Sequence, residues 1–145
     1  MWLFCLTVLF SSASASTSET GAWLTDYDHA IKQAAAEKKP GLIYFSGSDW
    51  CSECIRLNKE VFSRPEFLDY AKKNLVILNL DFPQKREQRA VLAARGVELA
   101  KQYKIYGFPT VIVLDADAKK LEEFGYRPGG VKRWLGLLDE LIAKK

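Results

Sequence analysis

The pair Cys51 and Cys54 is the part of this sequence whose residue types and spacing most directly indicate chemistry. It lies in the run SDWCSEC (48–54), which follows a short apolar run and opens a helical pattern. A cysteine at the start of a helix meets free backbone N–H groups and the positive end of the helix dipole, and both stabilise a thiolate. The thiolate is the nucleophile in thiol–disulfide exchange. Cys54 lies almost one helical turn further on, so we predict a redox-active pair that opens and closes with little backbone motion.

Other uses of a C-x-x-C pair fit this sequence less well. A structural disulfide across so short a gap would constrain a very small loop of the unfolded chain and would stabilise little. A zinc site needs four ligands, whereas the mature chain would offer these two cysteines and a distant His29. Haem attachment needs a histidine after the second cysteine, where this chain has Ile55. We therefore expect no metal and no cofactor beyond the disulfide itself; a metal cluster shared between two copies of the chain is the remaining alternative.

The first fifteen residues resemble a secretory signal peptide rather than part of a fold. Residues 2–10 are apolar except for Thr7, and Ala13-Ser14-Ala15 fits the small-residue pattern of a cleavage site. The apolar run is shorter than the roughly 20 residues that span a bilayer. We predict a signal peptide at 1–15, a polar, flexible lead-in at 16–21 and one domain at 22–145. Because no Lys or Arg precedes the apolar run, a loose anchor or a buried strand is the alternative.

Composition and charge are those of one ordinary domain. The chain has 145 residues, of which 48% are hydrophobic, enough for one sizeable core. Its 21 Lys and Arg are mixed with 18 Asp and Glu, giving a net charge of +3. A dedicated nucleic-acid binder would concentrate its basic residues on one face. We therefore expect no nucleic-acid partner, and we expect a monomer.

Apolar runs and capping signals divide the chain into alternating strands and helices. Strands are predicted at 42–45, 75–80, 110–114 and 120–124, with a short edge strand at 23–24. Asp26 should cap a helix over 27–37, and Ser63 should cap another that has Pro65 in its first turn. Further helices are predicted from Cys51 to about Val61, up to about Tyr103, and after Gly129. Strands separated by helices run parallel and the last two form a hairpin, which predicts a three-layer α/β/α fold with a central mixed sheet of four to five strands.

A second signal precedes the third strong strand, where Gly107-Phe108-Pro109-Thr110 stand in sequence. A proline is tolerated at the first position of a strand because no ladder donor is needed there. It is also a position at which a cis peptide bond can be fixed, and such bonds are rare. An ordinary proline at a strand entry is the alternative.

Together these motifs resemble the thioredoxin family over about residues 22–145. The resemblance rests on WCxxC at a strand–helix junction, Asn-Leu-Asp at 79–81, Gly-Phe-Pro-Thr at 107–110, and a hairpin followed by Phe124-Gly125. The runs GSDWC and DFP (81–83) resemble exported bacterial thioredoxin-like proteins, a group that includes periplasmic disulfide reductases. The resemblance implies the thioredoxin fold, thiol–disulfide oxidoreductase activity and a periplasmic location.

The same resemblance implies roles for individual residues. Cys51 would be the nucleophile and Cys54 the resolving thiol. Trp50 would flank the active-site surface, and Pro109 would be a cis-proline packed against the sulfurs. The backbone around Phe108, supported by Thr110, would pair with an extended substrate segment by strand addition.

Two positions depart from cytoplasmic thioredoxins, which carry a buried aspartate beneath the cysteines and a lysine beside it. Here Tyr44 and Ile77 stand at those places. The group that accepts the Cys54 proton is therefore an open question. Glu53 and Asp49 are candidates, and an exposed salt-bridging role is the alternative for both.

A basic stretch over residues 84–96 makes the chain longer than a minimal thioredoxin. It carries Lys85, Arg86, Arg89 and Arg95. We interpret it as a longer helix and its entry; a docking surface for a partner is the alternative.

The two residues between the cysteines, Ser52 and Glu53, should tune the pair. A carboxylate near the helix N-terminus opposes thiolate formation at Cys51 and so destabilises the reduced form, which makes the protein a better reductant. We predict a periplasmic protein-disulfide reductase that acts on exported proteins and is re-reduced by a membrane electron donor. The alternatives are a disulfide isomerase or oxidase of the same fold, or a non-catalytic binding module or holdase.

Overall fold

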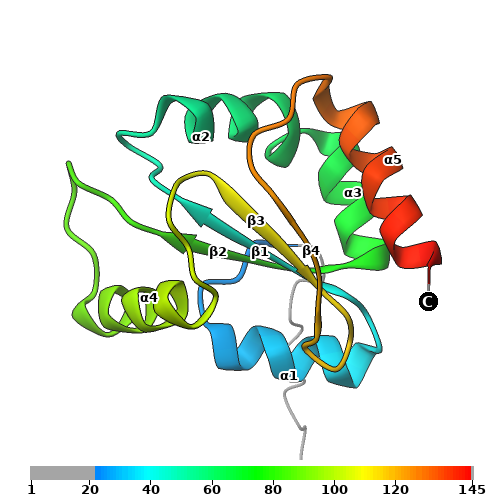
Figure 1. Cartoon of the computed structure of the whole chain (residues 1–145), viewed down its shortest axis with the longest axis horizontal. Helices are drawn as coiled ribbons and strands as arrows, with labels where there is room; N and C mark the ends of the chain where they lie inside the picture. Colours follow the sequence, from blue (N-terminus) through cyan, green and yellow to red (C-terminus); the bar gives the residue numbers. More distant parts are fainter. Residues whose placement is uncertain (1–21, 145) are drawn as a thin grey trace, which may run out of the picture.

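Four strands form one mixed sheet in the computed structural model of the chain, which describes residues 22–144 (Figure 1). They are β1 (Gly41–Ser46), β2 (Val76–Asp81), β3 (Thr110–Leu114) and β4 (Lys120–Phe124). Their order across the sheet is β2-β1-β3-β4. The β1–β2 pair is parallel, and the β1–β3 and β3–β4 pairs are antiparallel. The predicted signal peptide at 1–15 and lead-in at 16–21 lie outside the described residues.

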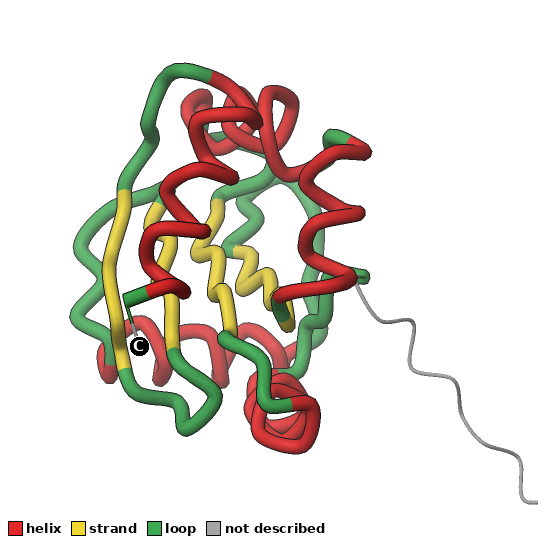
Figure 2. The backbone as a smooth tube through the Cα atoms, turned by 90° about the vertical axis from the view of Figure 1, so that its right-hand side faces the viewer, coloured by secondary structure: helices red, strands yellow, loops and turns green. Residues whose placement is uncertain are grey.

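Helices cover both faces of this sheet (Figures 1 and 2). One face carries α2 (Ser52–Leu57), the π-helical segment η1 (Asn58–Phe62), α3 (Pro65–Asn74) and α5 (Gly130–Ala143). The other carries α1 (Tyr27–Glu37) and α4 (Ala90–Gln102). The predicted three-layer thioredoxin fold is therefore confirmed, with four strands in the sheet. Within residues 22–144, no helix combines the length and the apolar character that a membrane crossing requires.

The central strand β1 is buried along its whole length. Side chains alternate between the two faces of a strand, so β1 contributes to both cores. Leu42 and Tyr44 belong to the core beneath α2, α3 and α5, whereas Ile43 and Phe45 belong to the core against α1 and α4. Tyr44 therefore lies on the face of the sheet that carries the helix of the cysteine pair.

The predicted edge strand at 23–24 is reduced to one parallel bridge between Leu24 and Leu78. Leu24 donates its N–H to the Ile77 carbonyl oxygen at 2.9 Å and accepts the N–H of Asn79 at 2.9 Å. The neighbouring Trp23 ring packs against Phe62 at a centroid distance of 5.3 Å. This short segment is therefore held as much by its aromatic side chain as by the sheet.

Of the two predicted side-chain caps, one is present and one is not. Asp26 caps α1 by accepting the backbone N–H of His29 at 2.9 Å, as predicted. The prediction that Ser63 caps the next helix is wrong, because Arg64 occupies the N-cap position of α3 and Pro65 follows it. Ser63 instead ends η1, and its hydroxyl donates to the Asn58 carbonyl oxygen at 2.6 Å. The same carbonyl oxygen also accepts the backbone N–H of Ser63 at 2.9 Å.

Candidate redox site

Cys51 and Cys54 form a disulfide at the start of α2, with their Cα atoms 5.2 Å apart. Cys51 is the N-cap residue of this helix, and its sulfur accepts the backbone N–H of Cys54 at 3.2 Å. An N–H that points at the Cys51 sulfur stabilises negative charge there. Cys51 keeps 7% of its surface exposed and Cys54 keeps 1%. An incoming group therefore reaches Cys51 before it reaches Cys54.

An aromatic surface lies beside the cysteine pair. Trp50, with 37% of its surface exposed, meets the Phe108 ring edge-to-face at a centroid distance of 5.6 Å. Phe108 also contacts Phe82 at 5.1 Å and packs against the buried cluster that contains both cysteines. The Trp50 indole N–H donates to the Phe82 carbonyl oxygen at 2.6 Å. The fold thus brings together Trp50 and Phe108, which the sequence singled out separately, and adds Phe82.

Residues 107–110, which lead into β3, are held by burial, a hydrogen bond and strand pairing. The peptide bond between Phe108 and Pro109 is cis, and both Pro109 and Thr110 are buried. The Thr110 hydroxyl donates to the Gly107 carbonyl oxygen at 2.7 Å. Thr110 also pairs with Phe45 in the β1–β3 register. This register places residues 107–109 alongside the loop that leads from β1 to Cys51.

Gly47 permits the close approach of the Trp50 indole to the backbone. A Cβ atom on Gly47 would lie only 2.6 Å from the indole Nε1. Real Cβ atoms do not approach another heavy atom so closely, so any side chain at position 47 would displace the ring. The glycine is therefore required by the position of Trp50.

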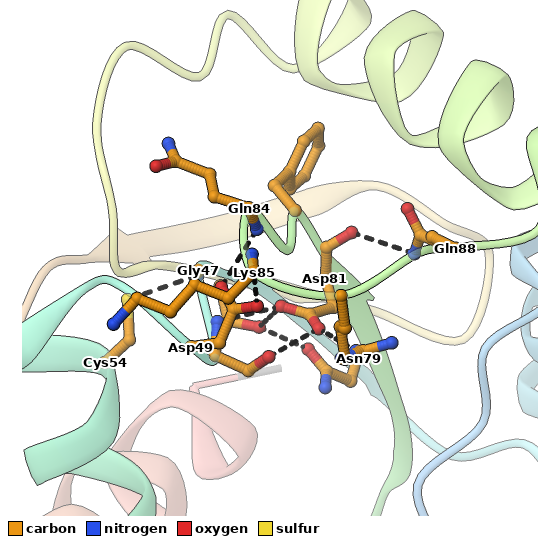
Figure 3. Close-up of polar contacts among 12 residues, drawn as sticks. Gly47, Asp49, Cys54, Asn79, Asp81, Gln84, Lys85 and Gln88 are labelled. Atoms are coloured by element: carbon orange, nitrogen blue, oxygen red, sulfur yellow. Dashed lines mark hydrogen bonds and ion pairs between the residues drawn. The ribbon is translucent and has the colours of Figure 1, made fainter.

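A polar cluster centred on Asp81 clamps the loop before the cysteines (Figure 3). The Asp81 carboxylate accepts the Ser48 backbone N–H at 2.9 Å, the Ser48 hydroxyl at 2.6 Å and the Ser46 hydroxyl at 3.2 Å. Arg86 forms an ion pair with the same carboxylate. Sequence reasoning missed this cluster. The available signal was the parallel pairing of the strands, because the carboxyl ends of β1 and β2 meet in the register Ser46–Asp81.

Asp49, one of the two candidate acceptors for the Cys54 proton, is committed to a loop contact instead. Its carboxylate accepts the backbone N–H groups of Gln84 at 2.9 Å and Lys85 at 2.8 Å. The Gln84 hydrogen bond, with help from Lys85, holds the pKa of Asp49 below its ordinary value, so this carboxylate is a weak base. Glu53, the other candidate, is exposed in the first turn of α2.

Tyr44 stands beneath the resolving cysteine. Its hydroxyl donates to the Cys54 carbonyl oxygen at 3.1 Å. Burial raises the pKa of Tyr44 well above its ordinary value, and the negative charge of Asp81 raises it further. The hydroxyl therefore stays protonated at neutral pH and has no capacity to take up a proton from Cys54.

Within residues 22–144, no three His, Cys, Asp or Glu side chains gather in a way that would hold a metal ion. The chemistry that this arrangement supports is exchange at sulfur: one reachable sulfur at a helix N-terminus, a second buried behind it, and an aromatic surface at their side.

Residues 27–138 match the family model of the thioredoxin-like domain. Disulfide bond reductase DsbH of Chlamydia pneumoniae is 36% identical over 104 residues, which cover 72% of this chain and 63% of that protein. Thioredoxin-related protein DsbJ of the same organism is 27% identical over 114 residues, which cover 79% of this chain and 33% of that protein. The chain thus spans less than two thirds of the length of either relative.

Among solved structures, one of DsbH oxidoreductase is similar with a TM-score of 0.80 and 28% sequence identity. The superposition covers 97% of this chain and 96% of that chain. A thioredoxin from Thermus thermophilus shares the fold with a TM-score of 0.62 and 24% identity, over 84% of this chain and 87% of that chain.

Proposed function

Because the chain belongs to the thioredoxin-like domain family, we propose that it is a thiol–disulfide oxidoreductase that reduces disulfides of exported proteins through Cys51 and Cys54. One observation carries this proposal: a cysteine pair at a helix start whose first sulfur is reachable and N–H-bonded while the second is buried. The similarity to a protein named disulfide bond reductase supports the same assignment. The proposed activity needs no bound cofactor, since the cysteine pair itself carries the two electrons.

In the proposed mechanism the Cys51 thiolate attacks one sulfur of a substrate disulfide. The substrate S–S bond breaks, a mixed disulfide forms at Cys51, and the first substrate thiolate leaves and takes up a proton. Cys54 then loses its proton and attacks the Cys51 sulfur. The mixed disulfide breaks, the second substrate thiol leaves, and the protein is left with the Cys51–Cys54 bond, the state seen here. Two electrons have passed from the pair to the substrate, so a dithiol donor, which we propose to be a membrane electron carrier, must restore the pair.

We propose that the substrate lies across Trp50, Phe108 and Pro109. The exposed edge of Trp50 and its contact with Phe108 offer an apolar platform next to Cys51. An extended substrate segment would pair with the backbone at Phe108, whose position Thr110 fixes through its hydrogen bond to Gly107. This arrangement would present many different disulfides to Cys51, because backbone pairing does not depend on sequence.

The periplasm is the location we propose, because residues 1–15 have the pattern of a signal peptide. Mass spectrometry of protein expressed in a Gram-negative host checks it. The mature chain should begin after Ala15 and should appear in the periplasmic fraction; an intact N-terminus in the cytoplasm would contradict the proposal.

An insulin-reduction assay with dithiothreitol tests the activity. The wild-type protein should accelerate insulin precipitation, whereas the double variant Cys51→Ser/Cys54→Ser should be inactive. Cys54→Ser should accumulate covalent complexes with substrate proteins because the resolving thiol is missing, and Cys51→Ser should accumulate none. If the double variant kept the biological function of the wild-type protein without reducing disulfides, that result would support a non-catalytic binding module or holdase instead.

The equilibrium potential of the pair, measured in glutathione or dithiothreitol buffers, tests the direction of electron flow. A reductase should lie near the roughly −270 mV of thioredoxin. A value above about −180 mV would favour a disulfide isomerase or an oxidase of the same fold.

A further inference from the structure

The second step of the proposed mechanism requires Cys54 to lose a proton while it is almost fully buried. Only 1% of its surface is exposed. Tyr44, which lies beneath it, donates its own proton to the Cys54 carbonyl oxygen and stays protonated. Asp49 uses both carboxylate oxygens on the loop at 84–85. Neither Tyr44 nor Asp49 therefore accepts the Cys54 proton.

A cavity of about 150 Å³ adjoins Cys54. Tyr44, Ser46, Ser48 and Asn79 contribute polar groups to its lining. Ile55 and Asn58, both exposed, line it as well, so the cavity reaches the surface of the protein. A volume of this size accommodates several water molecules, and a lining with this many donors and acceptors suits them.

Gly47 links the buried sulfur to the Asp81 cluster (Figure 3). Its backbone N–H points at the Cys54 sulfur at 3.5 Å. Of the serines on either side of it, Ser48 donates its hydroxyl group to Asp81 at 2.6 Å. The Ser46 hydroxyl lies 2.8 Å from the Asn79 Oδ1 atom and 3.2 Å from Asp81, so it donates mainly to Asn79. Because Ser48 also lines the cavity, its hydroxyl oxygen is available to cavity water while its proton faces the carboxylate. The Asp81 side chain is itself only 9% exposed.

We propose that Asp81 accepts the proton of Cys54 through cavity water and the Ser48 hydroxyl. The inference rests on the proposed function, since it concerns the resolving step. The S–H bond of Cys54 breaks and its proton passes to cavity water, while the Ser48 hydroxyl hands its own proton to Asp81 and takes one from the water, so that one proton in all reaches the carboxylate. The freed sulfur electron pair forms the bond to the Cys51 sulfur as the bond to the substrate sulfur breaks. Asp81 later returns its proton to solvent, and the leaving substrate thiolate takes one up.

The charged and titratable groups around this path come from four elements. They are Tyr44 from β1, Cys51 and Glu53 from the start of α2, Asp81 from β2, and Arg86 from the following loop. Two roles of Asp81 among these groups, as a nearby charge or as a proton acceptor, lead to opposite results when Asp81 is replaced. If Asp81 were only a nearby negative charge, its removal would favour the Cys54 thiolate and speed the resolving step. If it accepts the proton, its removal slows that step.

The reaction of the reduced protein with 5,5′-dithiobis(2-nitrobenzoate), followed by stopped flow, separates the two thiols. Attack by Cys51 releases the first coloured thiolate, and attack by Cys54 on the resulting mixed disulfide releases the second. Asp81→Asn should slow the second release at neutral pH about tenfold to a hundredfold and move its pH profile to higher pH, with the first release unchanged. Arg86→Gln is the matched control, because it breaks the same ion pair and keeps the carboxylate. Its second release should be as fast as in the wild type, or faster.

Two results would overturn the proposal. One is a faster second release in Asp81→Asn; the other is equal slowing in Asp81→Asn and Arg86→Gln, which would assign Asp81 to holding the loop. Ser48→Ala provides a second test if Asp81→Asn does not fold. It should slow the second release with the same shift of the pH profile, and an unchanged profile would count against the relay. A wild-type protein that gives no first release would instead contradict the proposed function itself.

Discussion

The Tyr44 hydroxyl donates a 3.1 Å hydrogen bond to the Cys54 carbonyl oxygen, which ties the central strand to the first turn of the cysteine helix. The same carbonyl accepts the backbone N–H of Asn58. Tyr44 also packs edge-to-face on Phe62 at a centroid distance of 4.8 Å. A tyrosine at this position therefore supports the redox site by holding the helix and not by exchanging protons.

Replacing Tyr44 by Phe should lower the free energy of unfolding by about 1 kcal/mol, because one net hydrogen bond is lost while the ring contacts remain. Urea unfolding of the oxidised protein measures this change. The insulin-reduction rate should stay within about twofold of the wild type. A folded Tyr44→Phe protein with most of its activity gone would show that the hydroxyl takes part in the reaction.

Gly47→Ala should displace the Trp50 indole, since the new Cβ would lie 2.6 Å from its Nε1. The hydrogen bond from Trp50 to the Phe82 carbonyl oxygen would break, and the platform against Phe108 would be lost. We expect a change in tryptophan fluorescence and a fall in insulin reduction of about tenfold or more, because misplacement of a binding surface by about 1 Å can cost that much. Gly136→Ala, in an open position on α5, is the control and should change neither.

Glu53→Gln should make the pair more oxidising. Glu53 lies in the first turn of α2, where its negative charge opposes the thiolate at Cys51. Without that charge the reduced form is more stable, and the reduction potential should rise. The rise should be at most about 30 mV, which corresponds to a change of one unit in the pKa of the Cys51 thiol. Equilibration with glutathione measures the shift. Glu140→Gln makes the same charge change late in α5 and should leave the potential as it is; an unchanged potential in Glu53→Gln would mean that solvent screens the charge.

Local signals in the sequence predicted most of the fold. Asp26 and the apolar spacing after it predicted α1 with its observed ends. Apolar runs predicted β1, β2 and β3, and the short connection after β3 predicted β4. The prediction failed at Ser63, which has a residue type typical of an N-cap: its backbone N–H and its hydroxyl both donate to the Asn58 carbonyl oxygen of the preceding helical segment instead. The predicted edge strand at 23–24 became a single bridge because Trp23 finds its main contacts in the core.

Some features of the site could be predicted from the sequence and others could not. The cysteine pair and the Trp50 platform could be found from spacing and resemblance, since each motif is continuous in sequence. The Asp81 cluster could not, because it depends on the register between β1 and β2 and on how the loops after both strands meet. The contacts of Asp49 could not be predicted from the sequence either. Its hydrogen-bond partners are Gln84 and Lys85, which lie near it because β1 and β2 are parallel and their carboxyl ends meet.

Asp49 should make the stability of the protein depend on pH in the acidic range. Hydrogen bonds from Gln84 and Lys85 hold its pKa below the ordinary value of 3.8 in the folded protein. The ionised carboxylate therefore stabilises the fold above about pH 4, and this contribution is lost as the pH falls through the lower folded-state pKa. Urea midpoints of the wild type and Asp49→Asn should differ at pH 7 and converge towards about pH 2, because a protonated carboxyl group and the amide that replaces it bind the loop alike. Asp69→Asn on α3 gives the same charge change away from this loop, so a convergence of equal size there would show that the effect belongs to overall charge and not to the Asp49 contact.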